Sequence, residues 1–280
     1  MENNNIEINK ASGEKVKFSL QKLRASLRHS GADDITIEQV INKVKDELYQ
    51  GISTKEIYNR VFALLKKKKS HFASKYKLKK AIYELGPTGF PFERFVSTIL
   101  HYSGYKTEVS KIIQGQCIKH EVDVIAHKKN ETTIIECKFH SEQGNNCNAK
   151  VPLYINSRYQ DLKTHWNANK KNGTKLTQGW VVTNTRFTKD ALQYGKCVDL
   201  YLLSWDYPIG NALKNRIDRL SLYPITVSTL LTAKEKEYLL QRNIILCREL
   251  VDESFYLDYL NISEIRKEKI INELKLLCKS

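Results

Sequence analysis

The sequence predicts an α/β chain in which two mostly helical segments flank a central segment that contains a β-sheet. Three observations predict this class: an apolar strand pair in mid-chain, a turn rich in glycine and proline ahead of it, and helical periodicity at both ends. The turn lies at 85–91, and a second change of pattern comes near 206–210. We therefore expect three domains, at residues 1–86, 87–210 and 211–280.

The N-terminal domain begins as a short hairpin and continues as helices. Ile6 and Ile8 alternate with polar residues, the turn contains Gly13, and the alternation returns from Val16 to Phe18. Three apolar series at helical spacing follow, each opened by a serine or threonine. We expect residues 1–86 to be mostly helical.

Two apolar strands of the central domain contain charged residues. Asp123 lies in the first strand, 120–126, and Glu136, Cys137 and Lys138 end the second, 133–138. Side chains alternate along a strand, so Glu136 and Lys138 leave the same face. An unpaired charge in so apolar a strand is costly, which indicates a function. Two carboxylates can hold a divalent cation that polarises a phosphodiester, and a nearby lysine can stabilise the developing charge.

Helices and strands continue around this pair. A helix is predicted at 92–100, and the sequence after the pair predicts helix, strand, helix and strand up to Trp205, giving an αβββαβ core. Over residues 88–207 the chain resembles the PD-(D/E)xK nuclease superfamily, and more narrowly its Mrr-like restriction endonuclease branch. The resemblance implies that Glu93, Asp123, Glu136 and Lys138 are the catalytic residues.

The same site implies a metal cofactor. Mg²⁺ (or Mn²⁺) suits an all-oxygen site, which Asp123, Glu136 and the main-chain carbonyl of Cys137 can supply. Glu93 can complete it through water.

The composition favours a polyanionic partner. The chain has 46 Lys plus Arg against 31 Asp plus Glu, a formal net charge of +15, which attracts nucleic acid without reading its sequence. The densest basic segment, 66–80, is interpreted either as a solvated helix face or as a surface that binds the DNA backbone. The candidate contacts to double-stranded DNA are Lys77, Lys79, Arg158, Asn184 and Arg186.

The N-terminal domain resembles the ATP-cone, a regulatory nucleotide sensor. The resemblance rests on Lys10, the turn at Gly13, Phe18, Lys22 and the helix start at 51–58. It implies that ATP or dATP binds at Lys10, Gly13, Lys22, Thr54 and Tyr58. The sequence has no P-loop motif, so we expect binding without hydrolysis, in a homo-oligomer that responds to nucleotide. A small helical module for DNA binding or dimerisation is the alternative.

Other features bound the class of protein. The six cysteines show no CxxC spacing, which favours reduced thiols over a zinc site. The sequence has no long apolar run and no charged-then-apolar leader, so we expect no membrane partner and a place in a prokaryotic cytoplasm. Apolar residues at helical spacing in 262–277 predict packing onto the nuclease domain or, alternatively, an interaction stripe.

These interpretations combine into one hypothesis: a metal-dependent DNA endonuclease, of restriction or defence type, regulated by a nucleotide. Two rivals use the same residues differently. A junction resolvase or an RNase could employ the same metal site, and a non-enzymatic, nucleotide-dependent DNA-binding regulator could contain a vestigial one.

Overall fold

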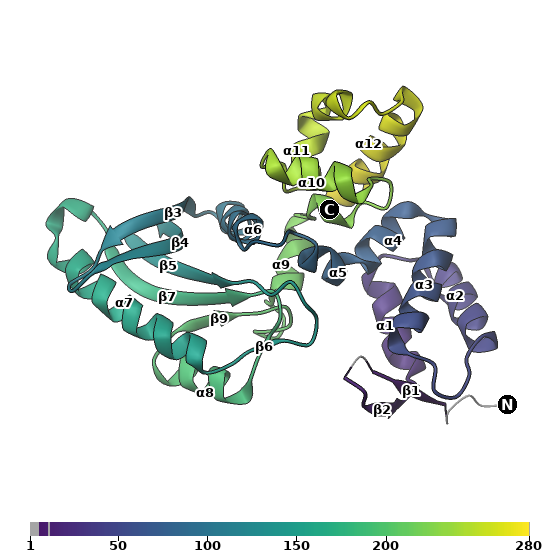
Figure 1. The fold of residues 1–280 in the computed structure, drawn as a ribbon, viewed down its shortest axis with the longest axis horizontal. Helices are drawn as coiled ribbons and strands as arrows, with labels where there is room; N and C mark the ends of the chain where they lie inside the picture. Colours follow the sequence, from purple (N-terminus) through teal and green to yellow (C-terminus); the bar gives the residue numbers. More distant parts are fainter. Residues whose placement is uncertain (1–5, 11, 280) are drawn as a thin grey trace. The chain divides into compact units, whose positions relative to one another are not determined.

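The computed structural model describes residues 6–10 and 12–279 of the 280-residue chain. The chain divides into two compact units (Figure 1). The first contains the chain up to Ala81 together with Ile225–Tyr238 and Cys247–Lys279, so it joins residues from both ends of the sequence. The second contains Ile82–Pro224 and Leu239–Leu246. The domain boundaries expected near 86 and 210 stay predictions.

The N-terminal part of the first unit is a hairpin followed by helices. Its elements are β1 (Glu7–Asn9), β2 (Lys15–Lys17), α1 (Leu20–His29), α2 (Asp34–Asp46), α3 (Thr54–Lys68), α4 (Ser70–Tyr76) and α5 (Leu78–Tyr83), the last of which runs into the second unit. Its core includes Leu27, Ile37, Ile41, Val61 and Leu65, each at most 1% exposed. Ile37 and Ile41, like Val61 and Leu65, are four residues apart, so each pair shares one helix face.

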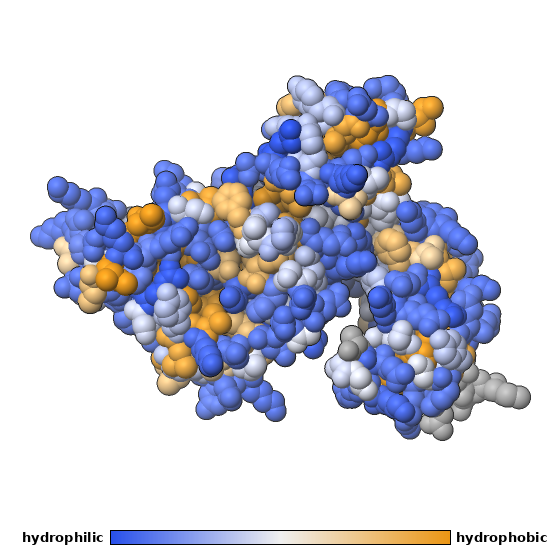
Figure 2. All heavy atoms as spheres, viewed as in Figure 1, coloured by the Kyte–Doolittle hydropathy of each residue, from blue (hydrophilic) through white to orange (hydrophobic). Residues whose placement is uncertain are grey.

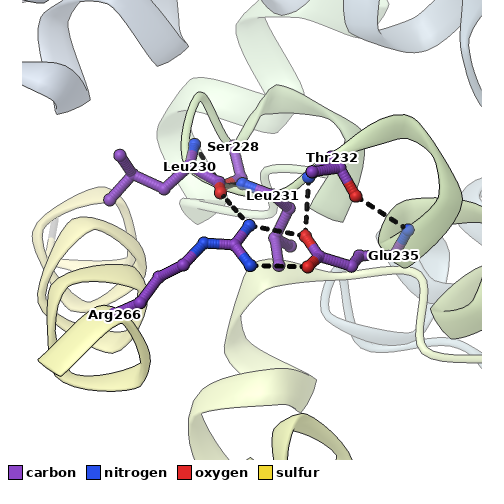
Figure 3. A network of polar contacts seen from close by, with 6 residues as sticks. All are labelled: Ser228, Leu230, Leu231, Thr232, Glu235 and Arg266. Atoms are coloured by element: carbon purple, nitrogen blue, oxygen red, sulfur yellow. Dashed lines mark hydrogen bonds and ion pairs between the residues drawn. The ribbon is translucent and has the colours of Figure 1, made fainter. Parts of the chain in front are cut away.

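The C-terminal segment consists of short helices. They are α9 (Leu213–Leu220), η2 (Ile225–Val227), α10 (Ala233–Gln241), α11 (Cys247–Asp252), η3 (Ser254–Leu260) and α12 (Glu264–Cys278). Arg266 of α12 forms a two-point ion pair with Glu235 of α10, at 2.6 and 2.7 Å, and donates to the Leu230 carbonyl (Figure 3). Glu235 also accepts from the Thr232 N–H, and Thr232 caps α10 in return. This network fixes α12 against the start of α10.

The second unit is built around a five-stranded mixed sheet. Its elements are α6 (Phe90–His101), β3 (Lys106–Gln114), β4 (Lys119–Lys128), β5 (Glu131–Lys138), β6 (Asn146–Cys147), α7 (Lys150–Ala168), η1 (Lys170–Asn172), β7 (Lys175–Thr183), β8 (Arg186–Phe187), α8 (Lys189–Cys197) and β9 (Tyr201–Leu203). The strand order is β3-β4-β5-β7-β9. The pairs β3/β4 and β4/β5 are antiparallel, whereas β5/β7 and β7/β9 are parallel.

Helices cover this sheet and bury the apolar strands. α6 contacts β3, β4 and β5, α7 packs along β7, and α8 contacts β9. One core cluster joins Val122, Ile125 and Ile134 of the sheet to Ile155, Tyr159 and Leu162 of α7. On the face shown in Figure 2, hydrophilic side chains predominate and apolar ones are scattered between them. The core therefore holds the middle of β4 and the end of β5, where the candidate site lies, in a fixed position.

The observed architecture confirms the α/β class, with helical segments at both ends and a mixed central sheet. All six cysteines are free. Among residues 6–10 and 12–279, no helix combines the length and apolar character needed to cross a membrane.

Candidate active site

The strand pair β4/β5 opens where the candidate catalytic residues begin. The ladder runs from Lys128/Glu131 to Val124/Ile135 and then ends. Beyond this point the Cys137 N–H donates to the Asp123 carboxylate, at 2.7 Å, in place of a strand partner. The N–H and C=O of one strand residue point to the same side, so the Cys137 carbonyl also faces Asp123. Continuing the register places Asp123 opposite Glu136, with both side chains on one face.

Three carboxylates from three elements repel one another here. Burial raises the pKa of Glu93 on α6 to about 7, and the charge of Asp123 adds to the effect. Burial and the charges of Asp123 and Glu93 raise the pKa of Glu136 to about 7 as well, although Arg158 opposes this. Burial also raises the pKa of Asp123, against the Cys137 N–H. The structure thus brings together all three carboxylates that the sequence predicted.

The Glu93 carboxylate lies over the start of its own helix. A Cβ atom on Gly89, the residue that caps α6, would come within 3.3 Å of Glu93 Oε1. The positive end of a helix dipole favours a negative charge at such a position.

Lys138 is exposed at the end of β5, and a buried segment fixes its backbone. The Thr183 hydroxyl at the end of β7 donates to the Lys138 carbonyl at 2.7 Å. The Asn184 side chain makes a two-point pair with the backbone of His140, accepting from its N–H at 2.9 Å and donating to its C=O at 2.8 Å. The backbone that carries the Lys138 side chain is therefore held by hydrogen bonds from Thr183 and Asn184, at the end of β7.

Asn184 is a correction to the sequence-based interpretation. Its side chain is 0% exposed, and its amide oxygen and nitrogen are both used by His140. A polar residue at a strand end can face inward as well as outward, and the Asn184 side chain faces inward. It therefore cannot reach a nucleic acid in this structure. Its role is to position the segment that follows Lys138.

Arg158 of α7 lies inside the site. Its guanidinium pairs with Glu136 at 2.8 Å, donates to the Glu121 carbonyl, and lies 5.5 Å from the ring centroid of Tyr154. Only 14% of the Arg158 side chain is exposed. The predicted arginine is therefore beside the carboxylates, where it offsets part of their mutual repulsion.

The donor set fits a hard divalent cation. Asp123 and Glu136 offer carboxylate oxygens, and the Cys137 carbonyl faces Asp123, whereas the Cys137 thiol leaves the opposite face of the strand from Glu136. A cation would also relieve the repulsion among the carboxylates. Within residues 6–10 and 12–279, no group of three or more His, Cys, Asp and Glu side chains is arranged to hold a metal. The fit therefore depends on two carboxylates and a main-chain oxygen.

The remaining candidate DNA contacts are Arg186, Lys77 and Lys79. Arg186 on β8 pairs with Asp206 at 2.6 Å and is 64% exposed. Lys79 is exposed on α5, whereas Lys77 is half-buried and donates to the Thr226 carbonyl at 3.0 Å. Lys66 likewise donates to the Thr229 carbonyl. Part of the basic segment thus binds backbone oxygens of the C-terminal segment within the first unit.

The predicted nucleotide-binding residues lie around the hairpin. Asn9 of β1 forms a bridge with Ser53, so Lys10 and Thr54 each follow a paired residue. Gly13 adopts φ +81°, which a glycine tolerates at a tight turn. Lys10 pairs with Glu14 at 2.8 Å, Lys22 is exposed on α1, and the Tyr58 ring stacks on Tyr76 at 5.2 Å. Whether these residues bind a nucleotide stays a prediction.

Sequence reasoning missed a second polar group beside the carboxylates. A groove of about 360 Å³ adjoins them, lined by Ile118, Lys119, His120, Glu121, Asp123, Glu136, Tyr154 and Arg158. His120 pairs there with Asp161 at 2.7 Å. Tyr154, Arg158 and Asp161 follow i, i+4, i+7 spacing along α7, and this polar stripe on one helix face was the available signal.

Comparisons with known proteins agree with this geometry. Residues 87–204 match the Mrr_cat restriction endonuclease family, and residues 223–278 match the AF1548-like C-terminal family. The chain is similar to the crystal structure of AF1548, described as a protein of unknown function, with a TM-score of 0.56 and 28% identity over 69% of this chain and 100% of that one.

The chain is also 30% identical to an uncharacterized protein of Archaeoglobus fulgidus over 156 residues, which are 56% of this chain and 83% of its relative. The chain contains a restriction endonuclease domain, which implies DNA as the substrate, followed by an AF1548-like C-terminal domain. It therefore belongs to the same family as the archaeal protein.

Proposed function

We propose that this chain is a metal-dependent DNA endonuclease whose activity responds to ATP or dATP. The observation that carries the catalytic part is the convergence of Glu93, Asp123 and Glu136 beside Lys138. Burial raises the pKa of each carboxyl, and the charge of Asp123 adds to this at Glu93 and Glu136. Such a cluster is unfavourable unless a cation binds it. The matched restriction endonuclease family supports DNA as the substrate.

Each residue has a distinct part in this proposal. Asp123, Glu136 and the Cys137 carbonyl would hold Mg²⁺ or Mn²⁺, and Glu93 would complete the site through water. When bound, the cation supplies Lewis-acid polarisation of the scissile phosphate and a more acidic water. The Lys138 ammonium orients the attacking water or stabilises the added negative charge. Arg158 keeps Glu136 oriented toward the groove.

Plasmid cleavage with Mg²⁺ or with EDTA tests the proposal. Asp123→Ala and Glu136→Ala should each reduce cleavage by more than about 100-fold, because losing even the partners of metal ligands costs 10–100-fold. DNA binding should persist. Glu131→Ala, an exposed carboxylate at the opposite end of β5, is the matched control and should cleave normally. Full activity in Asp123→Ala or Glu136→Ala, or equal cleavage in EDTA, would sink the assignment.

The two rivals give different results in the same assay. A panel of linear duplex, four-way junction and RNA substrates separates an endonuclease from a junction resolvase or an RNase. A non-enzymatic regulator would bind DNA and cleave none of these substrates with any metal. A role in restriction or defence within a prokaryotic cytoplasm follows only if duplex DNA is the substrate.

The nucleotide part of the proposal rests on the N-terminal hairpin. Lys10, the Gly13 turn and Thr54 lie close to the bridge between Asn9 and Ser53, and lysines with turn amides suit a triphosphate. A bound nucleotide changes cleavage only through different affinities for two conformations or assemblies. We therefore expect a homo-oligomer whose size depends on ATP or dATP.

Calorimetry and light scattering on the intact chain test this second part. Lys10→Ala and Lys22→Ala should each weaken nucleotide binding by about 1.5 to 3 kcal/mol, the usual size of a hydrogen bond to a charged group. Lys43→Ala on α2 is a control lysine that should bind normally. No heat of binding, together with one mass under all conditions, would leave residues 1–86 as a plain assembly or DNA-binding module.

A further inference from the structure

A histidine and an aspartate form a pair in the groove beside the carboxylates. His120 Nε2 lies 2.7 Å from Asp161 Oδ2, and the two side chains are only 10% and 14% exposed. A carboxylate only accepts hydrogen bonds, so Nε2 must donate. Among the described residues, His120 Nδ1 has no hydrogen-bond partner, although the ring borders the groove.

Asp161 holds this pair rigidly because it also organises the β3–β4 turn. Its carboxylate accepts from the Cys117 N–H at 2.8 Å, and its carbonyl accepts from Gln116 at 3.0 Å. A Cβ atom on Gly115 would overlap Asp161 Oδ2 and the Ile118 carbonyl oxygen, so the turn requires glycine there. The hydrogen bond from His120 is the largest cause that lowers the pKa of Asp161 to about 2. Asp161 therefore stays ionised beside the His120 ring.

The position of His120 relates it to the proposed cleavage site. His120 precedes Asp123 by three residues on β4, which corresponds to about 10 Å along a strand. Phosphates of one DNA strand advance about 3.4 Å along the helix axis per nucleotide. A DNA strand that runs along β4 with its scissile phosphate at Asp123 would therefore have another phosphate near His120 within about three nucleotides.

The groove contains charges of both signs. Lys119 and Arg158 line it together with Glu121, Asp123 and Glu136, and a cation held by Asp123 and Glu136, as proposed above, would offset those two carboxylates. Arg158 is already engaged by Glu136 and by the Glu121 carbonyl, so it is not free to take a second anion. Lys119 and, when the ring is protonated, Nδ1 of His120 are thus donors that remain inside the groove.

We propose that His120, oriented by Asp161, binds a backbone phosphate of the substrate strand within about three nucleotides of the scissile phosphate. This inference rests on the proposed nuclease function and adds a phosphate subsite to it. His120 is the binding residue, and Asp161 is a positioning residue that fixes the ring and leaves Nδ1 toward the groove.

Fluorescence anisotropy of the full chain with short duplex DNA in EDTA tests the subsite without cleavage. His120→Gln should weaken binding by about 10-fold, since a hydrogen bond to a charged group is lost. His127→Gln is the matched control: His127 lies on the same strand and bonds Thr132, outside the groove lining, and its loss should not change affinity. Asp161→Asn should fall between the two.

A series of duplexes with a single neutral methylphosphonate then locates the contact. The wild-type chain should lose affinity when one phosphate near the cleavage point is neutralised. The His120→Gln variant should bind that duplex as well as it binds the unmodified one. Neutralising the other phosphates should weaken binding by the same factor in both proteins. A structural effect of the mutation would instead weaken all duplexes equally. Equal wild-type and His120→Gln affinities, or identical position profiles, would overturn the inference while leaving the nuclease proposal intact. A wild-type chain that neither binds nor cleaves DNA overturns both.

Discussion

Buried carboxylates occur in both units, and their surroundings differ completely. In the first unit, Glu273 on α12 is 2% exposed. It accepts from the Ser74 hydroxyl at 2.9 Å, the Ser228 hydroxyl at 2.6 Å, and the Thr229 N–H and hydroxyl at 3.1 and 2.6 Å. In the second unit, Glu93, Asp123 and Glu136 face one another, and the pKa of each is raised.

The difference separates a structural charge from a functional one. Four donors from α4 and the segment before α10 replace the water that Glu273 loses on burial, so this carboxylate ties the ends of the chain together. The Glu93 cluster has one N–H and one arginine among three carboxylates, and its repulsion is left for a cation to relieve. Incomplete satisfaction, rather than burial, therefore marks the candidate site.

The largest effect on stability should come from removing the satisfied carboxylate. Glu273→Ala leaves its donors unpaired in a buried space, so we expect a loss of about 3 kcal/mol in unfolding free energy. Chemical denaturation of the full chain, followed by a probe on the first unit, measures it. Glu268→Ala, an exposed glutamate on the same helix, should change little. A loss as small as that of Glu268→Ala would contradict the structural role of Glu273.

An intermediate effect is expected at Asn184, which supports the site without carrying a charge. Asn184→Ala removes both hydrogen bonds to the His140 backbone, so stability should fall by about 2 kcal/mol. Because Lys138 is two residues before His140, plasmid cleavage by the folded protein should also fall, with DNA affinity nearly unchanged. Asn184→Asp keeps the acceptor for the His140 N–H and should retain more activity than Asn184→Ala. Unchanged cleavage in Asn184→Ala would show that Lys138 needs no support from β7.

Local patterns in the sequence predicted part of the candidate site. Glu136 and Lys138 are polar residues at strand spacing in an apolar run, whereas Glu93, in the first turn of α6, was predicted from the family resemblance. That these residues are catalytic stays a prediction. The strands and the helical ends follow from periodicity.

The partners of these residues could not be predicted, because they are distant in sequence. Asp161 is 41 residues from His120, and Ser74 is 199 residues from Glu273. A helical stripe such as that of α7 predicts one buried face but not which residues it meets. Asn184 shows the same limit, since its strand-end position fits either a surface contact or a buried clamp.

The smallest effect should come from pH, and it tests the unsatisfied carboxylates directly. The folded-state pKa of Glu93 is about 7, above its ordinary value of 4.5, so the folded state binds this proton more tightly than the unfolded chain does. The resulting stability is present at low pH and is lost as pH rises from 4.5 to about 7.

In EDTA, the melting temperature of the second unit should therefore fall by a few degrees across this window. Glu93→Gln should reduce the fall, whereas Glu131→Gln should not. Mg²⁺ should raise the melting temperature more above the window than below it, because the cation binds ionised carboxylates. Identical pH slopes for the wild-type chain and Glu93→Gln would mean that Glu93 is as well satisfied as Glu273.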